Sequence, residues 1–533
     1  MKSTPVYLRP DVQVDPLIHR WYAWVQIIAP ASAAFNVLER QYKTMKSFVA
    51  SPDLHVAALK SPAMRGGPFI DLPVGDAPAV GDLLRDMAQR TESQTRFVEA
   101  VRELDDLLEQ RGDGSSLETL YSDIPPLLRG YVELTYDRHH RPDFRVFESQ
   151  LYDSELYDQD AQSLMLGRFV GDDARPFIFS TPRLEQPDSV EIRLPFQSAA
   201  YDALFRTRSV SCPITELEEL LEIADKDKTT FRSLFTEQAP EPRSAYDAPE
   251  PRIRYFGHAC VLIEASGLSF LIDPVIPYSG DRTGISSFTF ADLPDRIDYV
   301  LITHGHHDHI SLETLIQLRS QIGSIILGRN VAGNMLDPSL KLLLERQGFQ
   351  NIRELSEFDR VDVGIGAITA LPFLGEHHDL GVGSKLCYHL RVNDRSLLFA
   401  ADACNFGHFV YERACRELGA LDALFIGMEC DGAPVSWVYG PAFTKRLPRD
   451  KDHSRRGRAS NCQEVLNLLE SVSCQNVYIY AMGSEPWMQY ILDVHYTDSS
   501  NPIVQSNQLI DACRARGISA ERLHGATEII LSN

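Results

Sequence analysis

A cluster of histidine and aspartate side chains restricts the folds open to this chain more than any other feature of its sequence. The segment THGHHDH, residues 303–309, follows the apolar run Tyr299–Ile302 and precedes a helical pattern that begins near Ser311. Imidazoles and carboxylates gain nothing from packing in a core, because each would have to be desolvated. On a loop after a strand, the alternating spacing lets the first two histidines point at one metal ion while the aspartate and the last histidine reach a neighbouring ion. The metal ligands predicted in this segment are His304, His306, Asp308 and His309.

Short apolar runs and helical stretches alternate around this segment. The runs RIRYF, CVLIEA and LSFLID precede it, and AITALPF, CYHLRV, SLLFAAD, ALFIGME and NVYIYA follow it. Helical stretches are expected at Ser311–Ser320, Tyr411–Leu418 and Ser460–Val472. This alternation predicts an α/β fold, a sandwich of two sheets flanked by helices, with ligands bound on the loops at strand ends.

The first half of the chain has a different pattern. A length of 533 residues exceeds what a single hydrophobic core supports, so at least two domains are expected. The segment TEQAPEPRSAYDAPEPR, rich in proline, alanine and charge, is typical of a linker. We therefore predict an N-terminal domain over residues 1–236, a linker over 237–251 and a second domain over 252–533. The N-terminal domain is expected to be mixed α/β, with helical stretches at Ala33–Phe48 and Val80–Leu107 and a strand pair at Tyr131–Tyr136 and Phe144–Ser149.

Composition excludes several classes of partner. A formal net charge of −22 argues against nonspecific binding of nucleic acid, which requires a basic surface. The most apolar early segment, Trp21–Phe35, is broken by Gln26 and Pro30, so neither a signal peptide nor a membrane span is expected. The nine cysteines show no paired or CxxC spacing, as is typical of reduced thiols. We expect a cytoplasmic protein without nucleic-acid or membrane partners.

The metal segment resembles the HxHxDH motif of the metallo-β-lactamase superfamily, which follows a buried strand in the same way. This resemblance covers about the C-terminal half and implies an αββα sandwich. A bridging aspartate ends a later strand in that superfamily, and LLFAADA places Asp402 there; such a carboxylate lowers the repulsion between two cations. Hydrolytic relatives carry a final histidine after a late strand, where VYIYAMGSEPW has Ala481. An apolar side chain cannot bind a metal ion, so the second ion should keep an open coordination position.

One more ligand is expected in FLGEHHDLGVGS, where spacing alone leaves Glu376, His377 and His378 as candidates. The GEHHD segment and the missing late histidine resemble the diiron β-hydroxylase of chloramphenicol biosynthesis and its relatives in nonribosomal peptide pathways. The similarity extends to YLRPDV, the Trp21–Trp24 helix, GGPFIDL, GSEPWMQYI and SNPIVQS, and so to nearly the whole chain. A carboxylate in place of an imidazole favours iron over zinc. The resemblance implies that His304, His306 and Glu376 bind one iron ion, Asp308 and His309 bind the other, and Asp402 bridges them.

The resemblance also implies an activity. It is that of an O2-dependent monooxygenase that hydroxylates Cβ of an amino acid held as a thioester on a carrier (thiolation) domain of a nonribosomal peptide synthetase, with two electrons from an external donor. Glu376 and Asp402 would be the catalytic carboxylates. The competing reading is a dizinc hydrolase of the lactonase or phosphodiesterase type, in which a metal-bound hydroxide attacks the substrate. Glu376 and Ala481 favour the oxygenase. The N-terminal domain is expected to cover the entrance, to form a homodimer or to hold the carrier protein.

The sequence leaves the roles of several further polar residues open. The run KRLPRDKDHSRRGR, residues 445–458, holds seven Lys or Arg against two Asp. It is either a docking site for an acidic carrier protein or a loop paired with the acidic surface of this same chain. His258 in YFGHAC is expected to make a structural hydrogen bond or to orient a metal ligand. Cys404 should lie near the metals without binding them, and the reserve ligands are His408, His453 and Glu429.

Overall fold

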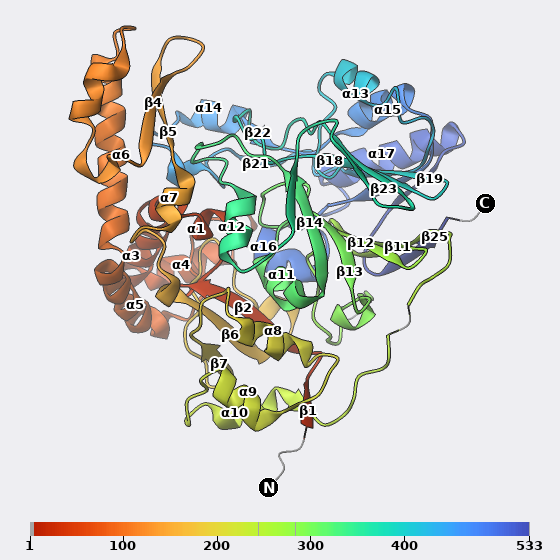
Figure 1. The fold of residues 1–533 in the computed structure, drawn as a ribbon, viewed down its shortest axis with the longest axis horizontal. Helices are drawn as coiled ribbons and strands as arrows, with labels where there is room; N and C mark the ends of the chain where they lie inside the picture. The colour runs from red at the N-terminus through yellow and green to blue at the C-terminus, as the bar shows by residue number, and fades with distance from the viewer. Residues whose placement is uncertain (1–4, 244, 283, 532–533) are drawn as a thin grey trace.

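Two seven-stranded sheets form the centre of the C-terminal part of the molecule (Figure 1). The structure is a computed structural model that describes residues 5–243, 245–282 and 284–531. The first sheet has the order β15-β14-β13-β12-β11-β10-β25. Its strands are β10 (Arg252–Gly257), β11 (Cys260–Ala265), β12 (Leu268–Ile272), β13 (Ile297–Leu301), β14 (Ile322–Gly328), β15 (Ile352–Leu355) and β25 (Thr527–Ile530).

The second sheet has the order β16-β17-β18-β19-β20-β23-β24. Its strands are β16 (Arg360–Asp362), β17 (Gly366–Leu371), β18 (Cys387–Val392), β19 (Arg395–Phe399), β20 (Leu421–Gly427), β23 (Cys474–Tyr480) and β24 (Ser519–Arg522). The facing sides of the two sheets share one apolar core, which includes Val261, Phe270, Leu390 and Phe399. This core explains why these strands are apolar on nearly every residue, since their other faces are covered by helices.

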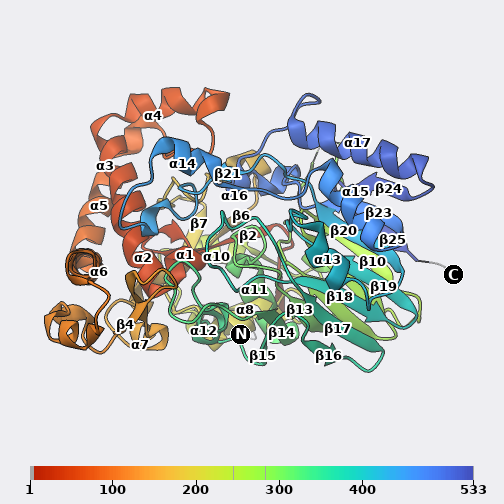
Figure 2. The ribbon, with the colours of Figure 1, turned by 90° about the horizontal axis from the view of Figure 1, so that it is seen from above.

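Helices cover the outer faces of both sheets (Figure 2). The second sheet packs against α13 (His408–Ala414), α15 (Cys462–Ser471) and α17 (Asn501–Ala515). On the first sheet lie α11 (Leu312–Leu318) and α12 (Leu340–Arg346). The side chain of Ser311 caps α11 by accepting the Thr314 N–H, and the side chains of Asn461 and Glu464 form a capping box on α15. The αββα sandwich predicted from the sequence is confirmed.

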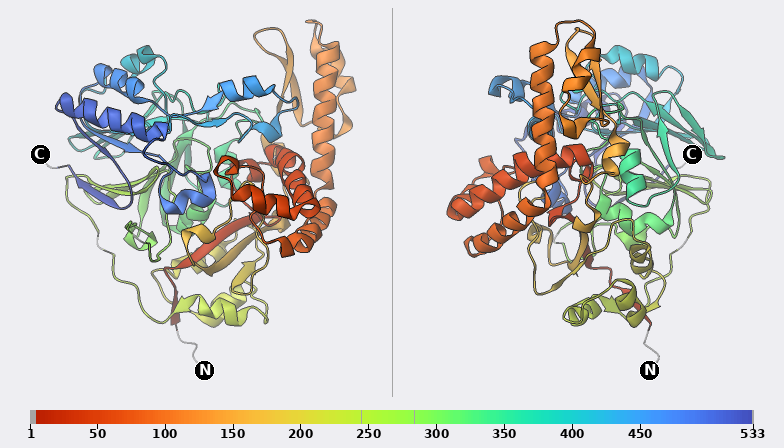
Figure 3. Two further views of the ribbon diagram at one scale, coloured as in Figure 1. Left: turned by 180° about the vertical axis from the view of Figure 1, so that it is seen from behind. Right: turned by 60° about the vertical axis from the view of Figure 1, so that its left-hand side comes forward.

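The N-terminal part combines a small sheet with a group of helices (Figure 3). The sheet has the order β3-β2-β6-β7, with β2 (Val12–Ile18), β3 (Trp21–Tyr22), β6 (Gln162–Arg168) and β7 (Ser189–Ile192). The helical region contains α1 (Val25–Ile28), α2 (Pro30–Asn36), the π-helix η1 (Val37–Gln41), α3 (Tyr42–Ala50), α4 (Pro52–Leu59), α5 (Ala77–Arg90) and α6 (Glu92–Arg111). The long helix α6 stands beside the hairpin β4 (Val132–Tyr136) and β5 (Pro142–Val146), with α7 (Glu148–Tyr152) after it.

A separate three-stranded sheet joins the chain start to the end of the N-terminal part. It has the order β8-β1-β9, with β1 (Pro5–Leu8), β8 (Cys212–Pro213) and β9 (Phe235–Thr236), and lies near α8 (Ala199–Arg206), α9 (Ile214–Leu220) and α10 (Lys228–Ser233). The expected mixed α/β character is therefore present. The expected helix at Trp21–Trp24 is wrong, because Trp21 and Tyr22 pair with Ile18 and Leu17 in a hairpin, and helix α1 begins only at Val25.

The two parts of the chain share a hydrophobic core. Val14 and Tyr201 from the N-terminal part belong to the same buried cluster as Leu271 and Leu315 from the first seven-stranded sheet and α11. The N-terminal part thus covers apolar surface that the sandwich alone would expose to water. All nine cysteines are free thiols. No helix within the described residues is both long enough and apolar enough to span a membrane.

Candidate metal centre

The predicted ligands gather where parallel strands end. Strands β12, β13 and β14 pair in parallel, so their carboxyl ends meet at one edge of the first sheet, the usual place for ligand sites in such sheets. The 303–309 loop leaves β13 at this edge, and an isolated bridge from His304 to Lys385 ties the loop to the chain that leads into the second sheet. Asp402 arrives from that sheet, just after β19. All four predicted ligands of the loop are buried.

His304 and His306 form the first half of the site. Their ligand atoms lie within 4.8 Å of each other and of a ring nitrogen of His377. The Nδ1 atom of His306 is also 3.1 Å from Oε1 of Glu376. The structure therefore brings both Glu376 and His377 to this half. The third candidate, His378, points its Nδ1 at the carbonyl oxygen of Arg455, 3.0 Å away.

Asp308, His309 and Asp402 form the second half. The Nε2 atom of His309 is 2.8 Å from Oδ2 of Asp402 and 3.6 Å from Oδ2 of Asp308. The same Asp402 oxygen is 3.9 Å from Nε2 of His304 in the first half. Asp402 thus lies between the two groups of predicted ligands, which is the place predicted for the bridging carboxylate.

Hydrogen bonds fix which nitrogen of each histidine faces the centre. The carboxylate of Asp273 accepts from the Thr303 hydroxyl at 2.6 Å and from Nδ1 of His309 at 2.8 Å. Because the Thr303 hydroxyl donates to Asp273, it accepts from Nδ1 of His304 at 3.1 Å. Both histidines therefore turn Nε2, the nitrogen that could bind a metal ion, toward the centre. His306 is turned the other way, with Nε2 3.1 Å from the Tyr439 hydroxyl and Nδ1 toward Glu376.

Asp273 is a functional residue that the sequence reasoning missed. It directly follows β12, the strand that pairs in parallel with β13, so its position at the same sheet edge was readable from LSFLID. An acidic residue at the carboxyl end of a strand beside the metal loop is the signal that could have found it.

His258 orients Asp308. Its Nδ1 accepts the Gly483 N–H at 3.1 Å, so its proton is on Nε2, which lies 3.1 Å from Oδ2 of Asp308. Of the two roles considered for His258, the orientation of a ligand is the one that this geometry supports. Ala481 N–H donates to the His258 carbonyl oxygen at 2.8 Å, and Ala481 lines a cavity together with Asp308 and Asp402.

The donor set fits two cations. Among the described residues, Nε2 of His304 and Oδ1 of Asp402 are buried without a hydrogen-bond partner. Burial, with the neighbouring imidazoles, lowers the pKa of His304 well below its usual value, so the ring is neutral and its lone pair is free. Burial, then Asp402 and Asp308, raise the pKa of Glu376 well above its usual value. Buried carboxylates that repel one another in this way are stabilised by bound metal ions.

A cavity of about 280 Å³ gives access to this centre. Besides Glu376, Asp402 and Asp308, its walls include Glu429, Trp437 and Ala481. Burial, with Glu376 and Asp402, raises the pKa of Glu429 to about 8. Of the reserve ligands, Glu429 alone lines the cavity; His408 and His453 are exposed on the surface. Cys404 is buried behind the Glu376 segment and donates to the Arg458 carbonyl oxygen at 2.8 Å.

The remaining histidine of the 303–309 loop, His307, faces the N-terminal part instead of the predicted ligands. Its Nε2 donates to the Ile491 carbonyl oxygen at 3.1 Å, and its ring packs on Phe179, Trp24 and Trp437. Aromatic side chains from both the N-terminal and the C-terminal part of the chain thus pack against the 303–309 loop.

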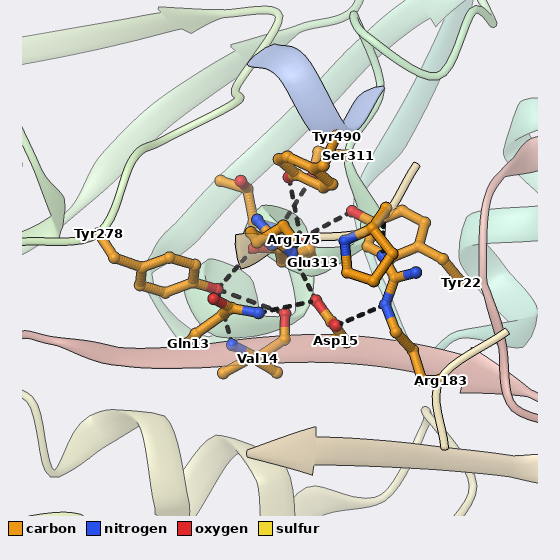
Figure 4. A network of polar contacts seen from close by, with 12 residues as sticks. Gln13, Val14, Asp15, Tyr22, Arg175, Arg183, Tyr278, Ser311, Glu313 and Tyr490 are labelled. Atoms are coloured by element: carbon orange, nitrogen blue, oxygen red, sulfur yellow. Dashed lines mark hydrogen bonds and ion pairs between the residues drawn. The ribbon is translucent and has the colours of Figure 1, made fainter. Parts of the chain in front are cut away.

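A buried polar network anchors the helix that follows the metal loop (Figure 4). Glu313 on α11 is buried and accepts hydrogen bonds from three tyrosines and one arginine. The arginine also pairs with Asp15 on β2, which Arg183 contacts as well at 2.9 Å. Burial alone would raise the pKa of Asp15, but the two guanidinium groups outweigh it and lower that pKa. The donors to Glu313 are Tyr278 at 2.7 Å, Tyr22 and Arg175 at 2.8 Å, and Tyr490 at 3.1 Å.

Comparison with known proteins identifies the family. Residues 7–240 match the model of the diiron non-heme β-hydroxylase N-terminal domain, and residues 252–429 match a β-lactamase superfamily domain. The chain is 37% identical, over 97% of its length and 98% of the relative's, to the 4-amino-L-phenylalanyl-[CmlP-peptidyl-carrier-protein] 3-hydroxylase of Streptomyces venezuelae. The chain belongs to the diiron β-hydroxylase family. The crystal structure of CmlA, a diiron β-hydroxylase from Streptomyces venezuelae, superposes with a TM-score of 0.92 at 36% identity, covering 99% of this chain and 100% of that one.

Membership of the diiron β-hydroxylase family decides between the two readings of the site. A shorter match, 29% identity over 26% of this chain, joins it to an uncharacterised protein family represented in Pyrococcus abyssi, and covers only 59% of that protein. The near-complete match to the diiron β-hydroxylases is the stronger one. It confirms an enzyme that uses two iron ions and dioxygen, and the dizinc hydrolase reading is wrong.

Proposed function

We propose that this diiron β-hydroxylase inserts oxygen at Cβ of an amino acid held as a thioester on the phosphopantetheine arm of a nonribosomal peptide synthetase carrier domain. The observation that carries the proposal is the end-to-end similarity to a hydroxylase whose name specifies a carrier-bound aminoacyl substrate. The reaction replaces one Cβ–H bond by a C–OH bond. The second oxygen atom of O2 leaves as water with two protons, and an external donor supplies two electrons.

We propose the ligand set on the geometry described above. His304, His306 and Glu376 would hold one iron ion, Asp308 and His309 the other, and Asp402 would bridge them. When bound, the two ferrous ions supply the activation of dioxygen. Glu376 is preferred to His377 as the third ligand because a carboxylate favours iron and is able to change its coordination.

The surrounding residues prepare the site for this chemistry. Asp273 keeps the proton of His309 on Nδ1, so Nε2 stays available as a ligand. His258 donates to Asp308 and fixes the direction of that carboxylate. Because the apolar side chain of Ala481 cannot bind a metal ion, the second ion would keep an open position for oxygen.

Three broader proposals accompany this function. The chain would divide into an N-terminal domain of residues 1–236, a linker of 237–251 and a catalytic domain of 252–533. The absence of helices and strands from the described residues of 237–251 supports this division. We further propose a cytoplasmic homodimer that receives its electrons from a separate redox protein. The N-terminal part would contribute the subunit contact and part of the carrier-protein contact.

The test combines metal analysis with a product assay. Protein expressed with added iron should contain about two iron ions per chain and give the Mössbauer spectrum of a coupled diferric pair. After chemical reduction and exposure to O2, a loaded carrier domain should gain the mass of one oxygen atom. Two tightly held zinc ions, with no mass change in any carrier-bound aminoacyl group, would contradict the proposal.

A further inference from the structure

A second cavity lies directly behind the wall of the metal cavity. Its volume is about 640 Å³, more than twice that of the metal cavity, and the two cavities share Gly66 and Trp437 in their walls. One side is formed by η1 and α3, which supply Arg40 and Lys43, and the other by residues 436–452. All the proposed metal ligands that line a cavity line the smaller one, so the larger one calls for a separate explanation.

Arg40 stands at the junction of the two cavities with unused hydrogen-bonding capacity. Its guanidinium group lies over the ring of Phe179, 4.6 Å from the centroid, and donates to the Trp437 carbonyl oxygen. Its Nη1 atom is buried and has no partner among the described residues. Burial lowers the pKa of Arg40 to about 10, which still leaves the group charged at neutral pH. A charged group whose buried donor has no partner is costly unless an anion occupies the space beside that donor.

The other charges of this cavity leave a positive surplus. The carboxylate of Glu39 is paired with Lys43 and with Arg102, and that of Asp452 accepts from the Ser436 N–H and hydroxyl, each at 2.8 Å. Arg446 also lines the cavity, and no carboxylate lies within ion-pair distance of it in the described part of the chain. This local surplus contrasts with the chain's net charge of −22.

The basic run 445–458 is therefore not one uniform patch. Lys445 pairs with Glu109, Arg455 donates from Nε to the His378 carbonyl oxygen at 2.8 Å, and Arg458 pairs with Glu464 at 2.7 Å. These contacts use part of the run inside the molecule. Arg446, in contrast, faces the cavity without an internal ion pair.

We propose that this cavity binds the phosphodiester of the phosphopantetheine arm, with Arg446 and Arg40 as the phosphate ligands. The inference rests on the proposed function, because a carrier-bound substrate must bring such an arm past the surface. Guanidinium groups bind phosphate through paired, charge-assisted hydrogen bonds. The apolar faces of Phe179 and Trp437 then line the path by which the thioester end reaches the metal cavity.

The test uses two probes that differ only in the phosphate. Iron-loaded, full-length protein is titrated calorimetrically with 4′-phosphopantetheine and with pantetheine, neither of which carries an amino acid. The phosphorylated probe should bind about tenfold or more tightly. Arg446→Ala should remove most of that preference. Arg449→Ala, an exposed arginine of the same run that does not line the cavity, should keep it.

Each other outcome overturns the inference. Equal binding of the two probes by the unaltered protein would exclude a phosphate site. Equal loss in both variants would indicate general attraction by the basic run instead of a local site. Arg40→Lys keeps the charge and loses the paired donors, so it tests the second proposed phosphate ligand. It should also weaken the preference for the phosphorylated probe, and an unchanged preference would exclude Arg40 as a ligand.

Failure of the inference and failure of the proposed function are distinguishable. Probe binding needs neither O2 nor a reductant, whereas the function is judged by iron content and by the mass of the carrier-bound product. Normal hydroxylation by Arg446→Ala with an unchanged KM for the carrier substrate would leave the function standing and exclude this cavity. A preference for the phosphorylated probe without any hydroxylation would support the phosphate site and contradict the proposed function.

Discussion

The two loops that supply the first half of the metal site are held in different ways. The histidine loop, residues 303–309, is fixed from behind by Asp273, from one side by the His304–Lys385 bridge and beyond its end by the Glu313 network. None of its seven residues has a positive φ. The glutamate loop, residues 375–379, has positive φ at Gly375, Glu376, His378 and Asp379. Such conformations cost about 1 kcal/mol or more for residues other than glycine.

This difference indicates that the histidine loop and the glutamate loop have different roles. The histidine loop would provide a rigid platform for both ions, because hydrogen bonds to Asp273 and Thr303 orient its side chains. The glutamate loop is strained and is tied by Arg455, which bonds with His378 in both directions. A strained segment with few ties changes conformation more easily than a braced one. The following predictions test the rigid platform first and the strained loop last.

The largest effect is expected at the residue that joins the two halves. Asp402→Ala removes the only carboxylate placed between His304 and His309 among the described residues. Iron content should fall from about two ions per chain to about one or fewer, and hydroxylation should stop. Asp394→Ala, at an exposed turn, is the matched control and should keep both ions. Retention of two ions by Asp402→Ala would disprove the bridging role.

The Glu313 network should contribute to global stability. Asp15→Asn leaves Arg183 buried without its counter-charge and leaves Arg175 with Glu313 alone, which should lower the free energy of unfolding by about 3 kcal/mol in urea titrations at pH 7. The folded-state pKa of Asp15 is lowered, so its contribution is present above the unfolded value of 3.8 and is lost as pH falls below it. The difference between variant and parent should therefore shrink in acid. A difference that stays constant from pH 7 to pH 3 would contradict this account.

The orientation of His309 should matter for metal affinity more than for folding. Asp273→Asn cannot hold the Thr303 hydroxyl and Nδ1 of His309 as the carboxylate does, so iron should bind about 10–100-fold more weakly in competition with a chelator. Asp298→Asn, which changes a carboxylate at the opposite end of the neighbouring strand, should leave the affinity unchanged. An unchanged affinity in Asp273→Asn would show that the rigid platform does not depend on this contact.

The local sequence pattern was enough to predict the histidine loop, but not the contacts that hold this loop in place. The ligands of the 303–309 loop lie within seven residues, and both the strand before it and the helix after it follow from apolar periodicity. Asp402 could be placed for the same reason, at the end of an apolar run. The strand pairing of Trp21 and Tyr22 was missed because the hairpin turn is made by His19 and Arg20, which adopt positive φ without any glycine to signal it.

Contacts between segments that are distant in the sequence could not be predicted from local patterns. Asp15 and Glu313 are nearly 300 positions apart, and Arg175 joins them only because β2 packs beside α11. The cavity wall at Gly66 and Trp437 likewise combines segments from both parts of the chain. Composition and periodicity describe each segment by itself, so they cannot show which charges will meet. The basic run illustrates this, since Arg455 and Arg458 bond with other parts of the chain, whereas Arg446 lines a cavity without an ion pair among the described residues.

The smallest predicted effect concerns the tie on the glutamate loop. Arg455→Ala removes the hydrogen bond from Nε to the His378 carbonyl oxygen, which should lower the free energy of opening of residues 375–379 by about 1 kcal/mol. Amide hydrogen exchange in this loop should then be about fivefold faster, while exchange in residues 303–309 stays unchanged. Arg449→Ala keeps the tie and should exchange like the parent protein. Faster exchange in both loops would mean that they move together, and the contrast between a rigid platform and a strained loop would no longer hold.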